Sequence, residues 1–183
     1  MSGIVGETDN VYLGGYPGPL RTLAGIWAEE IDALAPEQTN TVRFTDGTTA
    51  KCRIVCDLIH TEGAKSLASY ASDFYEGMPA VTSNAYGSGI TYYLATDMDE
   101  TGIAKVLDRA MTDGNVTAVI AEPTPLEITK RTTEAATYYF VMNFRDEAAP
   151  LPASLGGKLD LLTGKQTEAG ELMNKFDVKI IQE

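Results

Sequence analysis

The feature that most constrains the fold is a run of short extended segments joined by tight turns between Lys51 and Thr96. Its first segment, CRIVCDLI, is rich in β-branched residues and is followed by His60-Thr61-Glu62-Gly63. Residues 80–86 and 90–96 are separated only by Gly87-Ser88-Gly89, a pattern that predicts a β-hairpin. We therefore expect this part of the chain to form a sheet.

The preceding residues predict further short elements. PLRTLAG begins at Pro19, a favourable first helical residue, and predicts a short helix. GIWAEEIDAL, residues 25–34, fits either a strand or a helix, and we favour a strand. Residues 41–45 and 49–59 flank Asp46-Gly47 and predict a second hairpin.

The hydrophobic period changes after residue 98 and predicts an amphipathic helix over 99–111. Asp97 or Asp99 can cap its start, and Gly114 stands where such a helix would end. Its expected apolar stripe comprises Ile103, Val106, Leu107, Ala110 and Met111.

A boundary is expected near residues 115–125, where Pro123 and Pro125 interrupt the pattern. The chain beyond it has short strand-like segments at residues 126–132, 137–144, 158–164 and 176–182, which predict a small antiparallel sandwich. Aromatic and aliphatic residues share one face of the second and last segments: Tyr138, Phe140, Met142 and Phe144, then Phe176, Val178 and Ile180.

Charge excludes several partners. Fourteen basic and 26 acidic residues give a net charge of −12, which repels nucleic acid and anionic lipid. No apolar run approaches the roughly 20 residues that a membrane helix needs. The first residues carry Glu7 and Asp9 and no basic region, so they do not resemble a signal peptide. We expect a cytoplasmic protein that binds neither nucleic acid nor membrane.

Two cysteines, Cys52 and Cys56, stand four residues apart. On a regular strand their Cα atoms would be roughly 13 Å apart, too far for a disulfide. Two cysteines also lack the further ligands of a structural zinc site. We expect buried thiols in a reducing compartment.

Acidic residues offer no clear catalytic pair. Asp57 and His60 would point to opposite faces of a strand because their separation is odd. His60 is the only histidine, so it cannot belong to a histidine metal cluster. Glu29 and Glu30 are adjacent and would also diverge. The paired carboxylates of a glycosidase need a cleft that these positions do not define.

The glycine-rich turns and the aromatic residues also do not define a binding site. Gly87-Ser88-Gly89 and Gly156-Gly157-Lys158 lack the remainder of a phosphate-binding loop and are interpreted as turns. Four aromatic residues could line a sugar platform but are also ordinary core residues: Trp27, Tyr16, Tyr75 and Tyr86. We therefore expect no catalytic, cofactor-binding or metal-binding residue in this chain.

Three segments in this order resemble the C-terminal part of family 42 glycoside hydrolases, which are bacterial β-galactosidases. They are GGYPGPLRTLAGIWAEEIDAL, CDLIHTEGAKSLASYASDFYEGMPAVTSNAYGSGITYYLAT and a β-rich tail containing LDLLTG. The resemblance implies an α/β (α+β) fold: a partial flavodoxin-like or amidotransferase-like trimerisation domain over residues 1–115, then a small all-β antiparallel sandwich over residues 120–183.

The resemblance also implies that the chemistry of the family lies elsewhere. Its catalytic glutamates and its cysteine zinc cluster belong to a TIM barrel, which takes roughly 250 residues by itself. The chain is thus expected to begin partway through a domain, to be inactive alone, and to support a barrel and self-association as a homo-oligomer, with a trimer implied. The alternatives are a stand-alone carbohydrate-binding module and an assembly protein that works with a separate barrel chain.

Overall fold

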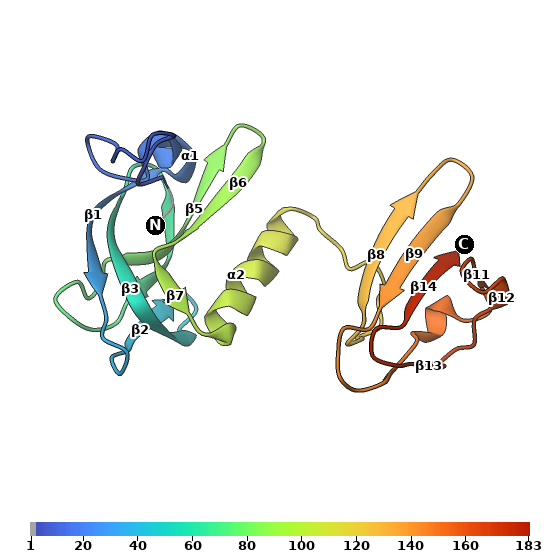
Figure 1. Ribbon diagram of the computed structural model, residues 1–183. Coiled ribbons are helices and arrows are strands. Elements are labelled where there is room, and N and C mark those ends of the chain that lie inside the picture. The colour runs from blue at the N-terminus through green and yellow to red at the C-terminus, as the bar shows by residue number, and fades with distance from the viewer. Residues whose placement is uncertain (1–2) are drawn as a thin grey trace. The chain divides into compact units, whose positions relative to one another are not determined.

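A computed structural model describes residues 3–183 of the protein and divides the chain into two compact units. Unit 1 ends at Val116, and unit 2 comprises Thr117–Glu183. Figure 1 shows that each unit has its own sheet, and each also has its own cluster of buried hydrophobic residues. Each unit therefore has the internal packing that an independent fold requires.

Unit 1 contains a seven-stranded antiparallel sheet whose main path runs β1-β3-β2-β4-β5-β6, with β7 paired to β3 (Figure 1). Its elements are η1 (Gly18–Leu20), α1 (Arg21–Ala24), β1 (Ile26–Ala33), β2 (Asn40–Phe44), β3 (Thr49–Thr61), β4 (Lys65–Tyr70), β5 (Pro79–Tyr86), β6 (Gly89–Leu94), β7 (Thr96–Met98) and α2 (Glu100–Asp113). These bounds confirm the short helix, the first strand, both hairpins and the long helix predicted from the sequence.

The β2–β3 hairpin forms because its turn residues provide the backbone conformation and the hydrogen bond that the turn requires. Gly47 has a φ of +87°, in the region that favours glycine. Asp46 Oδ1 accepts a hydrogen bond of 3.0 Å from the backbone N–H of Thr48, as expected of an aspartate in a turn.

Strand β3 changes partners along its length. Residues 49–52 pair with β2, and residues 55–61 pair with β1. Ile54 lies between the two pairings with a φ of +67°, an unusual conformation for a β-branched residue. The strand is consequently irregular at this point.

Helix α2 packs against the sheet through a narrower face than the sequence predicted. Val106 is buried and Ile103 packs against the core of unit 1. Leu107 and Met111, however, are 56% and 43% exposed. The expected five-residue stripe is therefore wrong in part, because only one edge of it meets the sheet.

Capping by Asp99 gives a testable stability effect. Asp99 Oδ1 accepts a hydrogen bond of 3.0 Å from the Gly102 N–H, and Asp99 Oδ2 accepts one of 2.9 Å from the Lys51 N–H. Both hydrogen bonds lower the pKa of the Asp99 carboxyl group, and the bond from Lys51 has the larger effect. Asp99→Ala should reduce the free energy of unfolding of unit 1 by about 1 kcal/mol at pH 7. The pKa of Asp99 is lower in the folded chain than in the unfolded chain. The stabilisation by its carboxylate should therefore be fully present above the unfolded-state pKa of about 3.9, and it should be lost as the pH falls through the folded-state pKa.

Urea unfolding of the wild-type chain and the variant at pH 7 and at low pH measures this difference. Asp99→Asn is the control, since asparagine still caps a helix but does not titrate. A difference between wild type and Asp99→Ala that stays constant down to the lowest pH would contradict the role given to the carboxylate charge.

Unit 2 contains a five-stranded antiparallel sheet in the order β12-β11-β14-β9-β8 and a two-stranded sheet of β10 and β13. The elements are β8 (Glu127–Thr132), β9 (Thr137–Met142), β10 (Ala149–Pro150), η2 (Ala153–Leu155), β11 (Leu159–Asp160), β12 (Lys165–Gln166), β13 (Leu172–Met173) and β14 (Val178–Gln182). Antiparallel pairing of short strands agrees with the prediction for this part of the chain.

The core of unit 2 lies on the face that the sequence pattern did not single out. Val141 and Ile181 are fully buried, with Leu151, Leu155 and Met173 beneath them. The opposite face carries Phe140 and Ile180, which are cross-strand partners and remain partly exposed. Aliphatic residues therefore fill most of the core, with Tyr139 packed against it, whereas Phe140 lies on the other face of the sheet.

The flavodoxin-like expectation is not confirmed. Every strand pairing in unit 1 among residues 3–183 is antiparallel, whereas flavodoxin-like sheets are mostly parallel with helices on both faces. The fold is thus mainly antiparallel β, with α2 as its one long helix in the described part of the chain. Within residues 3–183, no helix combines the length and apolar character needed to cross a membrane.

Candidate functional site

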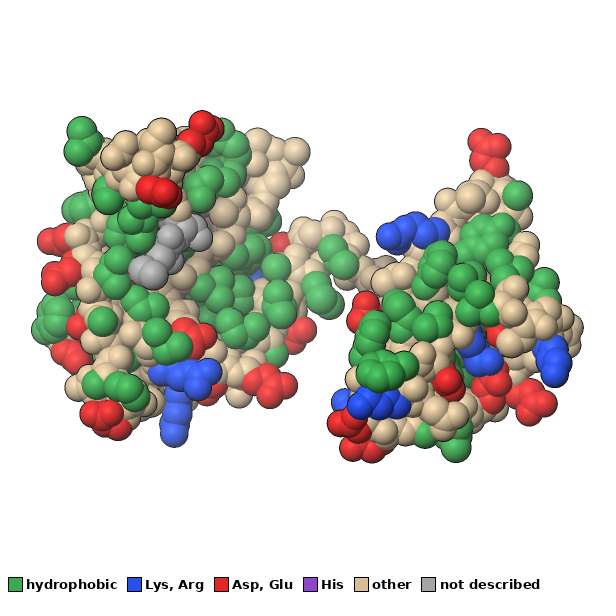
Figure 2. Space-filling view, in the orientation of Figure 1, with side chains coloured by type: hydrophobic (Ala, Val, Ile, Leu, Met, Phe, Trp, Pro, Cys, Tyr) green, Lys and Arg blue, Asp and Glu red, His purple; other side chains and the backbone are tan. Residues whose placement is uncertain are grey.

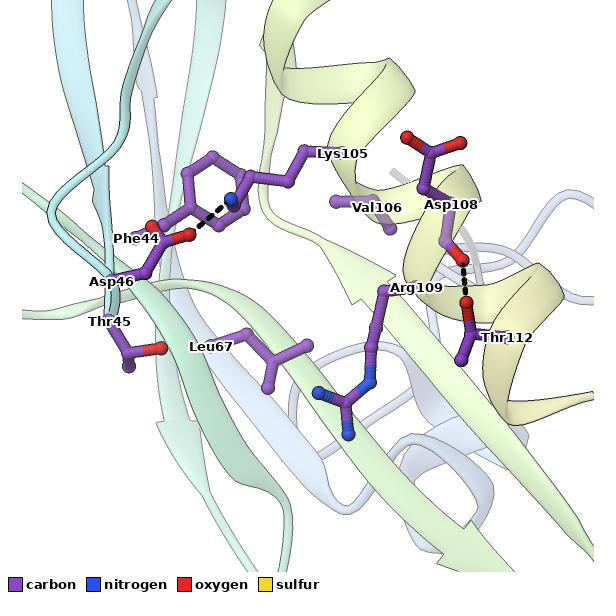
Figure 3. A pocket seen from close by; sticks show the side chains of 9 residues that line it. All are labelled: Phe44, Thr45, Asp46, Leu67, Lys105, Val106, Asp108, Arg109 and Thr112. Atoms are coloured by element: carbon purple, nitrogen blue, oxygen red, sulfur yellow. Dashed lines mark hydrogen bonds and ion pairs between the residues drawn. The ribbon is translucent and has the colours of Figure 1, made fainter.

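A pocket of about 400 Å³ lies between α2 and the sheet of unit 1 (Figure 3). The sheet side contributes Phe44, Thr45, Asp46 and Leu67, and α2 contributes Lys105, Val106, Asp108, Arg109 and Thr112. Lys105 Nζ donates to Asp46 Oδ2 at 2.5 Å and lies 5.4 Å from the centre of the Phe44 ring. Arg109 donates to Asp113 at 2.7 Å. Both cations in the pocket are therefore paired with acids.

These ion pairs limit what the pocket can do chemically. The hydrogen bond from Lys105 lowers the pKa of Asp46 to about 2. A general acid in glycoside hydrolysis needs the opposite shift, a raised carboxyl pKa that keeps its proton near neutral pH. Asp46 thus remains an ionised partner of Lys105 and does not have the character of a catalytic acid.

Asp57, the first acid considered from the sequence, lies inside unit 1 and is 2% exposed. Its Oδ2 accepts a hydrogen bond of 3.0 Å from the Tyr93 hydroxyl. Burial, reinforced by the Asp57 charge, raises the pKa of both Tyr16 and Tyr93, so both phenols stay protonated. Asp57 Oδ1 has no hydrogen-bond partner among the described protein atoms. The cluster is a buried polar network within the core.

His60 lies in a different setting from Asp57. Its ring stacks on Trp27 with the ring centres 4.7 Å apart, and its Nε2 is 2.7 Å from Glu29 Oε2. Glu29 reaches His60 because it is the extra residue of a β-bulge: Ala28 pairs with Ile59 and Glu30 pairs with Leu58. The structure therefore joins His60 to Glu29, a contact that strict strand alternation does not predict.

The four aromatic residues weighed as a sugar platform do not converge. Tyr75 is buried in the core and donates to Asp32 at 2.9 Å. Tyr16 is part of the Asp57 network, and one face of Trp27 is covered by His60. Tyr86 is exposed at the end of β5. They belong to separate environments.

The expected separation of the two cysteines is wrong. Cys52 and Cys56 pair with Met98 and Thr96 of β7, so four steps along β3 face only two steps along β7. The irregularity at Ile54 absorbs the difference, and the two thiols lie close enough to shift each other's pKa. The sequence offered no signal for this bulge, because Ile54 is a typical strand residue.

Exposed hydrophobic side chains form two surfaces. The unit 1 apolar end is carried by the N-terminal loop, η1 and the tip of the β5–β6 hairpin, which lie at the same end of unit 1 in Figure 1; its exposed side chains are Val5, Val11, Tyr12, Leu13, Leu20, Tyr86 and Ile90. The unit 2 open face lies on β9 and β14, where hydrophobic side chains gather in Figure 2, and comprises Tyr138, Phe140, Met142, Val178 and Ile180. Leu13 is fully exposed. Surfaces of this kind are typical of interaction sites.

The fold and its surfaces define a two-unit antiparallel β protein in which Asp46 and Glu29 are paired and Asp57 is buried, and whose apolar surfaces are open. Comparison with protein families then places it. Residues 1–117 match the family model of the β-galactosidase trimerisation domain, and residues 126–183 match that of the β-galactosidase C-terminal domain. The chain belongs to these β-galactosidase domain families, which confirms the resemblance to family 42 glycoside hydrolases.

Individual relatives agree. The chain is 42% identical over 183 residues to the β-galactosidase LacA of Lactobacillus acidophilus and 39% identical over 186 residues to BgaA of Planococcus sp.. A crystal structure of a β-galactosidase from Bacillus circulans sp. alkalophilus superposes on the whole chain with a TM-score of 0.84 and 37% identity. The chain spans 27% of LacA, 28% of BgaA and 28% of the B. circulans protein.

Proposed function

We propose that this chain supplies subunit contacts and structural support to a β-galactosidase whose bond-breaking groups lie on a TIM barrel outside these 183 residues. The observation that carries the proposal is the match of residues 1–117 to a trimerisation domain, together with the open unit 1 apolar end within those residues. The whole enzyme would hydrolyse terminal β-galactosides with retention, through two barrel carboxylates about 5 Å apart.

Four finer points belong to the same proposal. Residues 1–115 act as the oligomerisation part and residues 120–183 as the supporting β domain. Any parallel, flavodoxin-like portion of the trimerisation domain lies outside this chain. No residue of the chain serves as a catalytic, cofactor-binding or metal-binding group. The protein works in the cytoplasm, in agreement with its two free buried thiols.

The expected assembly is a homotrimer held through the unit 1 apolar end. Sedimentation velocity of the purified chain at increasing concentration should show a trimer. Leu13→Asp combined with Leu20→Asp should shift the population to monomer, because charge placed in a hydrophobic contact loses hydration without a partner. Leu107→Asp is the matched control: Leu107 is also exposed but lies on α2, so its charge should leave the trimer intact.

A wild-type chain that remains monomeric throughout would refute the assembly role. The same preparations should show no turnover of a chromogenic β-galactoside, and measurable hydrolysis would contradict the placement of the chemistry. Saturable galactoside binding by calorimetry, without self-association, would favour the carbohydrate-binding alternative instead.

A further inference from the structure

The cysteine pair of unit 1 has a geometry that a regular strand cannot produce. Cys52 and Cys56 face Met98 and Thr96, which are two residues apart on β7. Two strand residues span about 6.6 Å, so the Cα atoms of the cysteines are brought from roughly 13 Å to the upper end of the disulfide range. Since Met98 and Thr96 lie on one face of β7, their two partners also lie on one face of β3.

The surroundings of the pair affect the two thiols differently. Cys56 is fully buried, and its Sγ lies 3.6 Å from Thr96 Oγ1. The interaction with the Cys52 thiol lowers the pKa of Cys56, against the opposing effect of burial. The same thiol–thiol interaction, with burial, raises the pKa of Cys52. Of the two thiols, Cys56 is therefore the one whose deprotonation the pair favours.

Cys52 also has a route to solvent. It lines a pocket of about 340 Å³ together with Thr39, Lys51, Arg53, Asp99 and Glu100. The Cys52 side chain is only 1% exposed, so it lies at the base of this pocket. A small disulfide can thus approach Cys52 from the pocket, whereas Cys56 is not among the residues that line it.

We propose that Cys52 and Cys56 form a redox-sensitive dithiol that a small-molecule disulfide converts to an intramolecular disulfide. Cys52, which lines the pocket, gives up its proton as its sulfur attacks one sulfur of the oxidant; a mixed disulfide forms, the external disulfide bond breaks, and the first thiol leaves carrying that proton. The Cys56 thiolate then attacks Cys52 Sγ, which forms the Cys52–Cys56 bond, breaks the mixed disulfide and releases the second thiol. Two protein thiols are oxidised, the external disulfide is reduced to two thiols, and the two protein protons end on the products.

Mass spectrometry of the intact chain tests this reaction. The reduced chain is exposed to glutathione disulfide under native conditions, unfolded, and treated with N-ethylmaleimide. The wild type should lose two hydrogen atoms and take up no maleimide. Cys56→Ser should instead accumulate a glutathione adduct on Cys52, because no second thiol resolves it. Cys52→Ser should keep a free, alkylatable Cys56 under the same exposure.

Circular dichroism melting of each variant before oxidation ensures that only folded protein is compared. A folded wild-type chain that takes up two maleimide groups after the exposure would overturn the proposal. Adducts of equal amount on folded Cys52→Ser and Cys56→Ser would contradict the order of attack. A wild-type chain that carries two glutathione groups would also overturn it, since that outcome means that the two sulfur atoms cannot reach each other.

Discussion

Replacing Ile181 with alanine is expected to lower the melting temperature of unit 2 by about 15 °C and to leave that of unit 1 unchanged. Ile181 is fully buried and belongs to the small core that also contains Val141, Leu151 and Leu155. Removing a buried isoleucine side chain costs about 3 kcal/mol through lost burial and the cavity left behind. In a domain of this size each kcal/mol shifts the midpoint by about 4–8 °C.

The physical reason for the selective effect is that the two units have separate hydrophobic cores. Differential scanning calorimetry with intrinsic tyrosine fluorescence resolves the two transitions. Ile59→Ala is the matched control, since Ile59 is also fully buried but belongs to the core of unit 1. It should lower only the other transition. If either substitution moves a single shared transition, the two units do not unfold independently and the proposed division of the chain is incorrect.

The second large effect is expected at Gly102, where α2 contacts the sheet. A Cβ atom at this position would lie 2.9 Å from Ala50 Cβ, Met98 Cβ and Met98 Sδ. Gly102→Val should therefore lower the free energy of unfolding of unit 1 by about 3 kcal/mol, because the larger side chain cannot enter this contact without displacing the helix. Urea unfolding measures the loss.

The direction of the change in unfolding free energy for Gly102→Val distinguishes a packing clash from an effect of helix propensity. At an exposed site, replacing glycine with valine would favour the helix slightly. Ala104→Val is the control, since Ala104 is exposed on the same helix, and it should cost only about 0.5 kcal/mol. A Gly102→Val chain as stable as the wild type would show that α2 does not pack on β3 and β7 as described.

Local patterns were sufficient for much of the fold. The hairpin at Gly87-Ser88-Gly89, the turn at Asp46-Gly47 and the helix after Asp99 were all predicted from neighbouring residues. Each depends on contacts within a few residues: a turn conformation, a cap or a period of apolar residues. The long and ordered resemblance to family 42 proteins likewise resided in the sequence, and the family models confirm it.

Three other features depended on contacts between distant residues. The bulge at Glu29 exists because Ala28 and Glu30 keep register with β3, and it brings Glu29 to His60. The irregularity at Ile54 exists because β3 pairs with β2, β1 and β7 in turn. The buried face of the unit 2 sheet is the one that the segment from Ala149 to Met173 covers.

By itself the sequence determined the kinds of elements, their order, the acidic surface charge and the family. The tertiary structure alone decided which carboxylates are paired, which sheet faces stay open and which two thiols meet. The reason is one of range: turns, caps and periodicity are fixed by neighbours in the chain, whereas strand register and bulges follow from pairing across the sheet. A one-residue change in strand register alters which side chains face each other, and the register cannot be predicted from neighbouring residues in the chain.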